Sequence, residues 1–106
     1  MGVILKMERE YKKDMDIKEL KQFIDNLKID VCYKNIIIKG FKRNETNDIL
    51  QELARMKGLQ FEIEFSRGSW FYTIKKPCKK FLNREGQWSM QMSKKAKEFI
   101  YEYENT

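Results

Sequence analysis

Two glutamates, Glu62 and Glu64, stand two residues apart and would point the same way from one extended strand. A carboxylate pair can carry out acid–base chemistry, or bind a metal ion, when burial separates the two pKa values. The same spacing is typical of the solvated face of an amphipathic strand, and this is the interpretation we prefer. A metal-dependent nuclease would also need a lysine near these acids, and Lys75 is the one that the sequence offers. We therefore expect no catalytic residues and keep a histidine-free carboxylate enzyme as the alternative.

The chain has no histidine. This removes the commonest general base, the usual partner of a serine or cysteine nucleophile, and the commonest metal ligand. Two separate cysteines, Cys32 and Cys78, do not make a zinc site, which usually takes four clustered ligands. Neither familiar glycine-rich phosphate loop occurs. The sequence therefore predicts a protein with no metal and no cofactor that acts by binding.

Cys78 is flanked by lysines on both sides, in the run Lys75-Lys76-Pro77-Cys78-Lys79-Lys80. Neighbouring cations favour the thiolate form of a cysteine, so a reactive thiol and an incidental loop cysteine both stay open. Cys32 lies in an apolar stretch and is expected to be a small core residue. So few cysteines indicate reduced thiols in a cytoplasmic protein, although one disulfide between the two is not ruled out.

Positive charge is concentrated in one part of this chain of net charge +6, because residues 75–97 carry eight basic side chains against Glu85 alone. Lysine ammonium groups neutralise phosphates and release condensed counterions, which gives salt-dependent binding with little sequence preference. Phe71 precedes this segment on the polar side of a predicted hairpin, where an open ring could stack on a base. The predicted contact residues for nucleic acid or another partner are Arg67, Phe71, Lys75, Lys76, Lys79, Lys80, Arg84, Lys94 and Lys95.

These residues favour a nucleic-acid-binding accessory or regulatory protein. The alternative is a small inhibitor or adaptor of the kind that phages and mobile elements encode, anti-CRISPR proteins among them, which docks on a larger protein or nucleoprotein complex. Its contact patch would be Phe71, the hairpin that bears Trp70, and the basic loop, since aromatic residues and arginine anchor many interfaces. The expected partner is nucleic acid or a nucleic-acid-handling protein, and a homodimer formed through the hairpin edge is compatible with each function.

The 106 residues suit one domain with its own core. No stretch reaches the roughly 18 to 20 apolar residues that span a bilayer, so no membrane partner is expected. Residues 1–15 are expected to be a flexible or helical arm. A first helix is predicted from about Asp16 to Lys28, with Asp16 and Glu19 forming a capping box. Its apolar stripe is Ile17, Leu20, Phe23, Ile24 and Leu27.

Residues 29–41 are rich in β-branched and aromatic residues and are predicted to be extended, either as one strand or as two strands joined at Lys34-Asn35. Gly40 indicates a strand end. A second helix is predicted from about Asn44 to Lys57, with Asn44 or Thr46 as its cap. Gly58 stands where a left-handed helix stop is expected.

Strict alternation predicts a strand over residues 59–65, and Ser66-Arg67-Gly68-Ser69 predicts a tight turn into a second strand over residues 70–75. The turn places Phe65 opposite Trp70, Ile63 opposite Tyr72 and Phe61 opposite Ile74. Alternation at Trp88, Met90 and Met92 predicts a third strand. Ser93 is then expected to cap a last helix with the stripe Ala96, Phe99, Ile100 and Tyr103. The prediction is one α+β domain over residues 1–106, in the order α-β-α-β-β-β-α, with about three helices on one face of a mainly antiparallel sheet.

The segment from Ile49 to Ile74 resembles the recognition helix and wing of winged-helix DNA-binding domains. It contains a helix, the Gly58-Leu59 break and a hairpin whose turn bears Arg67. The resemblance implies a helix in the major groove and a wing tip on the DNA backbone. It covers about a quarter of the chain. The chain departs from the family pattern before this segment, where a further helix is required and residues 29–41 are predicted to be extended.

Overall fold

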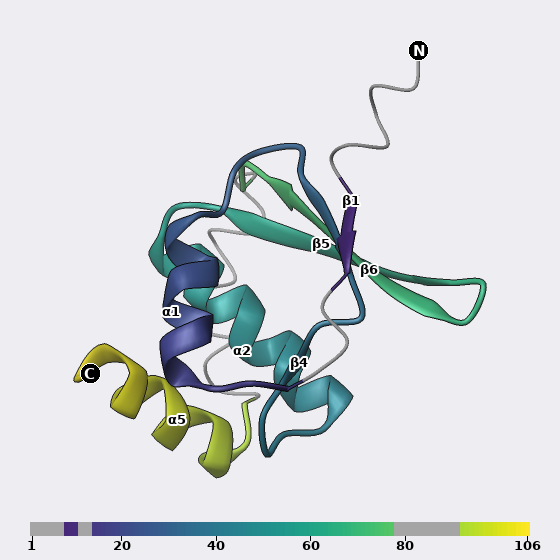
Figure 1. The fold of residues 1–106 in the computed structure, drawn as a ribbon. Helices are drawn as coiled ribbons and strands as arrows, with labels where there is room; N and C mark the ends of the chain where they lie inside the picture. The colour runs from purple at the N-terminus through teal and green to yellow at the C-terminus, as the bar shows by residue number, and fades with distance from the viewer. Residues whose placement is uncertain (1–7, 11–13, 78–91) are drawn as a thin grey trace.

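The computed structural model describes residues 8–10, 14–77 and 92–106, and it confirms a small α+β fold with three helices and a mainly antiparallel sheet (Figure 1). The elements, in chain order, are β1 (Glu8–Glu10), β2 (Asp14–Met15), α1 (Ile17–Asp25), β3 (Cys32–Lys34), β4 (Ile37–Ile38), α2 (Arg43–Met56), β5 (Gln60–Ser66), β6 (Ser69–Lys75) and α5 (Lys94–Glu104). The main sheet has the order β1-β3-β6-β5, and only its β1–β3 pair is parallel. A second, two-stranded parallel sheet joins β2 to β4.

The start of the chain differs from the predicted order. Where a flexible or helical arm was expected, the described parts of residues 1–15 are the strands β1 and β2. Each runs parallel to a strand of the 29–41 segment, with Glu8 opposite Cys32 and Met15 opposite Ile38. The charged residues of β1 have little intrinsic preference for strand, so pairing with β3 decides their conformation.

Residues 29–41 form two short strands that break at Asn35, as one of the two predicted alternatives has it, but the strands belong to different sheets and make no hairpin. The chain leaves the main sheet after β3, takes a left-handed conformation at Asn35 with φ 50°, and enters the small sheet as β4. Asn35 also ties this break to β6, since its backbone N–H donates to the Trp70 carbonyl at 2.8 Å and its side-chain Oδ1 accepts from the Trp70 N–H at 3.0 Å. The predicted strand end at Gly40 is confirmed by its φ of 86° in the turn after β4.

The predicted caps hold for two helices and fail for the third. Asp16 and Glu19 form the expected capping box of α1, and Ser93 caps α5 by accepting from the Ala96 N–H at 3.1 Å. The cap of α2 was predicted wrongly, because the helix begins one residue early and Lys42 occupies the cap position. Thr46 is instead fully buried in the second turn of α2.

The hairpin is confirmed with the predicted register along its whole length. Arg67 and Gly68 both have positive φ, 52° and 79°, as a two-residue turn of the twisted hairpin type requires. The left-handed stop at Gly58 is confirmed as well, with φ 83°. One set of alternating residues of β5 and β6 packs into the core, and no described helix covers the opposite side of the sheet, which we call its open side.

The core lies between the sheet and the helices. Phe23 of α1 packs edge-on against Tyr33 of β3, with ring centroids 4.8 Å apart, and is stacked on Phe61 of β5 at 6.4 Å. Ala96, Ile100 and Tyr103 of the predicted α5 stripe are buried, and Phe99 packs against the same cluster. The predicted third strand falls mainly on residues 88–91, which lie outside the described residues.

Candidate functional site

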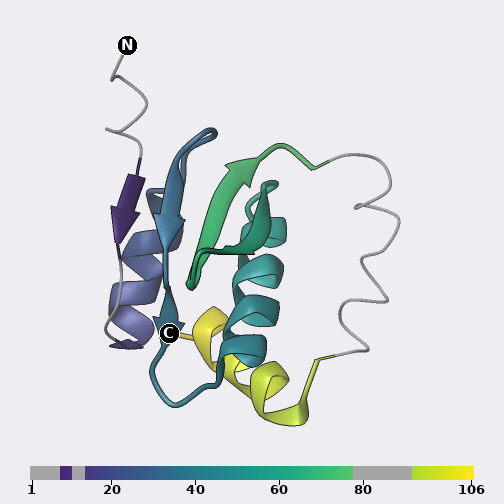
Figure 2. The ribbon, with the colours of Figure 1, turned by 90° about the vertical axis from the view of Figure 1, so that its right-hand side faces the viewer.

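The predicted cationic residues belong to separate parts of the fold. Lys75 ends β6 and Lys76 follows it, whereas Lys94 and Lys95 begin α5, and these two places lie at opposite ends of the molecule in both views (Figures 1 and 2). The lysines at these two places do not form one surface. Lys79, Lys80 and Arg84 lie outside the described residues.

The lysines at the end of β6 have an acidic neighbour. The Lys75 ammonium lies 3.3 Å from the Asp30 carboxylate, and both side chains are exposed. Such an exposed pair contributes little stability, about 0 to 1 kcal/mol, but it offsets charge locally. This place therefore offers less positive potential than the sequence run indicates.

The lysines at the start of α5 are joined to another basic segment. Lys95 Nζ donates a hydrogen bond to the Gly40 carbonyl and lies 4.6 Å from the centroid of the Phe41 ring. Phe41 in turn packs edge-on against Phe99 of α5, at 5.0 Å. These contacts hold the loop between β4 and α2 against α5, and Lys39 and Lys42 lie in that loop.

We name the exposed lysines that this contact brings together the loop–helix surface: Lys39, Lys42, Lys94 and Lys95. The Glu45 carboxylate lies close to Lys42 and Lys95, and Asp16 lines the same hollow as Lys39. The pKa of Glu45 is lowered, chiefly by the hydrogen bond from the Lys42 backbone N–H. Desolvation is the next-largest influence and opposes this shift, whereas the Ser93 hydroxyl and the ammonium groups of Lys95 and Lys42 add to it. The surface keeps a positive balance.

The helix starts add to this balance. All three helices begin toward the same end of the molecule, the lower end in Figure 1. The N-terminus of a helix carries about half a positive charge, which favours anions within its first turn. Sequence analysis missed Lys39 and Lys42, since both lie outside the lysine-rich segment of residues 75–97. Only the fold brings the loop that carries them against Lys95 at the start of α5.

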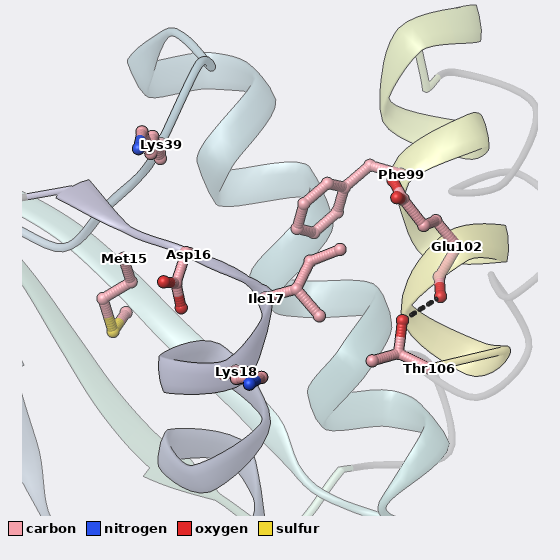
Figure 3. Close-up of a pocket in the computed structure, with 8 residues that line it drawn as sticks. All are labelled: Met15, Asp16, Ile17, Lys18, Lys39, Phe99, Glu102 and Thr106. Carbon is pink, nitrogen blue, oxygen red and sulfur yellow. Dashed lines mark hydrogen bonds between the residues drawn. The ribbon is translucent and has the colours of Figure 1, made fainter.

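An open hollow of about 610 Å³ lies next to the loop–helix surface (Figure 3). Ile17 and Phe99 give it apolar walls, and Lys39 contributes one edge. Its lining residues are Met15, Asp16, Ile17, Lys18, Lys39, Phe99, Glu102 and Thr106. Two acidic and two basic side chains lie around it, so its charge selects neither an anion nor a cation.

Of the two predicted contact residues of the hairpin, Phe71 is only partly available, whereas Arg67 is exposed. Phe71 is half-buried on the open side of the sheet, and the Lys34 ammonium lies 5.4 Å from its ring centroid. Glu64 stands opposite Phe71 on β5. A base could not stack on this ring without displacing that lysine. Arg67 is exposed at the hairpin turn.

The carboxylate pair of the enzyme alternative is solvated. Glu62 and Glu64 are both exposed on the open side of the sheet, and Lys75 stands opposite Gln60 and close to Asp30. Across residues 8–10, 14–77 and 92–106, no group of three or more histidine, cysteine or acidic side chains is placed to hold a metal ion. Cys32 is a free, half-buried thiol in β3, and Cys78 lies outside the described residues.

No protein-family model, curated protein or solved structure matches this chain. The helix and hairpin of the winged-helix resemblance are present as α2, β5 and β6. The segment before α2 consists of the strands β3 and β4, so the further helix of that family is missing there. Ile49, Leu50 and Leu53 of α2 are buried against the core. In the described part of the chain, no helix is long and apolar enough to cross a membrane.

Proposed function

We propose that this chain is a nucleic-acid-binding accessory or regulatory protein that uses the loop–helix surface, and that it performs no catalysis. The observation that carries the proposal is the contact of Lys95 with Gly40 and Phe41, which joins two lysine pairs far apart in the sequence into one exposed positive surface. The net charge of +6 supports the same partner, since a positive protein attracts polyanions over long range.

The arrangement favours phosphate groups over bases. An ammonium group has three donors and no acceptor, so the surface offers donors that suit phosphate oxygens. Lys95 uses one donor on Gly40 and is held over Phe41, which reduces the side-chain entropy that it would lose on binding. Such a surface positions a protein on a nucleic-acid backbone without reading its sequence.

Fluorescence anisotropy with single-stranded and duplex oligonucleotides at several salt concentrations tests this function. If each of the four lysines neutralises one phosphate of duplex DNA, the plot of log affinity against log salt concentration should have a slope no steeper than about −3.6. With that slope, affinity should fall roughly 100-fold between 50 and 200 mM salt. The double variant Lys42→Ala/Lys94→Ala should make this slope shallower by about 1.8.

The matched control is Lys75→Ala/Lys76→Ala, which removes the same charge from the end of β6. We expect it to keep most of the slope. Equal effects of the two double variants would show that only net charge matters. Absence of binding to any oligonucleotide at low salt, where counterion release is strongest, would refute the proposal.

A second candidate function, docking on a larger protein, is favoured by the hairpin. Its turn extends away from the three helices (Figure 1). Phe65 near the turn is 58% exposed, and its ring lies 5.1 Å from that of Trp70. Aromatic side chains and an arginine at an exposed turn are common anchors of protein interfaces.

A further inference from the structure

The outer edge of β5 carries backbone groups that point away from the sheet. The Ile74 N–H of β6 donates to the Val31 carbonyl at 3.1 Å, so Ile74 directs its backbone groups away from β5. In an antiparallel pair, directly opposite residues either exchange hydrogen bonds or both point away. Phe61 lies opposite Ile74 and therefore points outward, and so do Ile63 and Phe65 at steps of two.

A side-chain contact supports this assignment. The Phe61 carbonyl accepts a hydrogen bond from Gln51 Nε2 at 2.6 Å, on the side away from β6. In the part of the chain that the structure describes, the N–H and C=O groups of Ile63 and Phe65 have no hydrogen-bond partner. Among the strands that the structure describes, β5 is the last of the sheet, so its outward-pointing residues Ile63 and Phe65 are ready to pair with another strand.

A hollow of about 360 Å³ lies beside this edge, between α2 and β5. Gln51, which is only 9% exposed, lines it, and its Oε1 atom is buried without a hydrogen-bond partner among the described residues. The remaining lining residues are Asn47, Asp48, Gln60, Phe61, Glu62 and Ile63. Asp48 and Glu62 are carboxylates, and the Asn47 amide oxygen already accepts from the Tyr72 hydroxyl. The hollow therefore offers acceptors and suits a group that donates several hydrogen bonds.

We propose that the β5 edge binds an extended, lysine- or arginine-bearing segment of a partner protein, which adds to the sheet as a fifth strand. The inference goes beyond nucleic-acid binding and gives the docking function a site and a partner chemistry. Ile63 and Phe65 each exchange two backbone hydrogen bonds with the added strand, and backbone pairing of this kind supplies affinity that depends little on sequence.

The side chains of the added strand decide which segment binds. Those on the open side of the sheet lie next to Glu62 and Glu64, which favour lysine or arginine. Those on the helix side lie next to Phe65, which favours an apolar residue, and next to the hollow. A lysine or arginine that enters the hollow gives Gln51 Oε1 the donor that it lacks.

Charge argues against a second copy of this chain as the occupant. Symmetric antiparallel pairing of two β5 strands about Ile63 places Glu62 of each copy opposite Glu64 of the other. Like charges directly opposite each other destabilise a strand pair. A basic segment instead meets the two carboxylates of one chain, Glu62 and Glu64, with favourable charge.

The test uses ten-residue peptides of alternating lysine and valine, capped at both ends, with the glutamate–valine peptide as control. Amide hydrogen exchange of the ¹⁵N-labelled protein is followed by NMR at millimolar peptide. We expect the lysine peptide to slow exchange at the Ile63 and Phe65 amides, about tenfold at a concentration ten times its dissociation constant. Equal binding of the glutamate peptide, or no protection at these amides, would overturn the inference.

Variants separate backbone pairing from charge. Ile63→Pro removes one outward N–H without touching the β5–β6 ladder and should abolish binding, whereas Ile63→Val should preserve it. If Ile63→Pro does not fold, the double variant Glu62→Gln/Glu64→Gln tests whether the lysine peptide binds at this edge. This double variant should lower the affinity for the lysine peptide roughly fivefold, since each exposed ion pair contributes modestly to binding. The control Glu98→Gln/Glu102→Gln on α5 should have little effect on that affinity.

Two further outcomes are decisive. If, without peptide, protection of the Ile63 amide rises with protein concentration, then the β5 edge binds a second copy of the chain and not a partner segment. Nucleic-acid affinity should survive Glu62→Gln/Glu64→Gln, because those residues lie outside the loop–helix surface. If the unsubstituted chain binds oligonucleotides but not the lysine peptide, the edge site alone is refuted. If it binds the peptide but no oligonucleotide, the nucleic-acid function alone is refuted.

Discussion

Replacing Thr46 with valine should measure one hydrogen bond that connects α2 to the small sheet. Thr46 and Ile38 are both fully buried, and Thr46 Oγ1 accepts from the Ile38 N–H at 3.2 Å. The Ile38 N–H has no alternative acceptor in β2, because adjacent N–H groups of a strand point to opposite sides. The N–H on the β2 side is that of the next residue, Lys39, which donates to the Met15 carbonyl at 2.9 Å. Valine has nearly the shape of threonine, so the change removes the acceptor and leaves little cavity.

The expected cost follows from the unpaired donor. A buried N–H that loses its partner costs about 1 to 3 kcal/mol. The added methyl group recovers up to about 0.8 kcal/mol by apolar burial. We therefore expect Thr46→Val to lower the free energy of unfolding by about 0.2 to 3 kcal/mol. In a domain of this size that corresponds to a fall in Tm of about 4 to 8 °C for each kcal/mol.

Urea unfolding followed by circular dichroism measures this change, provided that the slope with urea stays constant. Thr46→Ser is the control, because it keeps the hydroxyl and loses the methyl group. Exchange of the Ile38 amide should become faster in Thr46→Val than in Thr46→Ser. A valine variant as stable as the natural chain, with unchanged Ile38 exchange, would show that this hydrogen bond contributes nothing.

Three further substitutions test local features. Burial and the nearby Glu45 raise the pKa of Asp48, so the ionised carboxylate destabilises the folded state. Asp48→Asn should therefore raise the free energy of unfolding by up to about 0.5 kcal/mol at neutral pH. Unfolding measured at several pH values should show that this gain disappears below the pKa that Asp48 has in the unfolded chain. Gly58→Ala should cost about 1 to 2 kcal/mol in urea unfolding because φ is 83°, and Gly58→Asn should cost less. Tyr72→Phe removes the hydroxyl that accepts from Arg43 at 2.7 Å and should cost about 1 to 3 kcal/mol by the same assay, whereas no loss would exclude a role for that bond.

The parts of the fold that the sequence predicts well are those set by neighbouring residues. The register of the hairpin follows from a two-residue turn, so Phe65 meets Trp70 as soon as the turn is identified. The capping box of α1 spans only Asp16 to Glu19. Periods of two and of 3.6 residues likewise need no knowledge of the remaining chain.

The parts that it predicts poorly are set by distant partners. β1 is a strand because it lies beside β3, and nothing in Glu8-Arg9-Glu10 predicts that position. Thr46 has the residue type of a helix cap but is buried, because the chain reaches α2 from β4 and places the Ile38 N–H beside it. The cap position is occupied by Lys42, whose N–H is satisfied by Glu45.

The candidate site shows the same limit. A run of lysines in the sequence indicates charge but not direction, and the fold separates Lys75 from Lys94. The positive surface instead combines two short segments through Lys95 and Gly40. The acidic edge of β5 was visible in the sequence as the alternation of Glu62 and Glu64. That the backbone groups of Ile63 and Phe65 point outward, and that Gln51 Oε1 lacks a partner among the described residues, could be recognised only from the folded structure.

The two proposed surfaces are neighbours along α2, which makes salt a means of separating them. Lys42 precedes the first turn, and Asn47, the first residue of the β5 hollow, follows five residues later, about 7.5 Å along the axis. One nucleoprotein partner could thus contact both surfaces. Oligonucleotide binding should weaken steeply with salt, because each phosphate contact releases counterions. Binding of the lysine peptide should weaken far less, since salt also screens the repulsion between that peptide and the net charge of +6. A peptide affinity that falls as steeply as oligonucleotide affinity would mean that simple charge attraction, and not strand addition, holds the peptide.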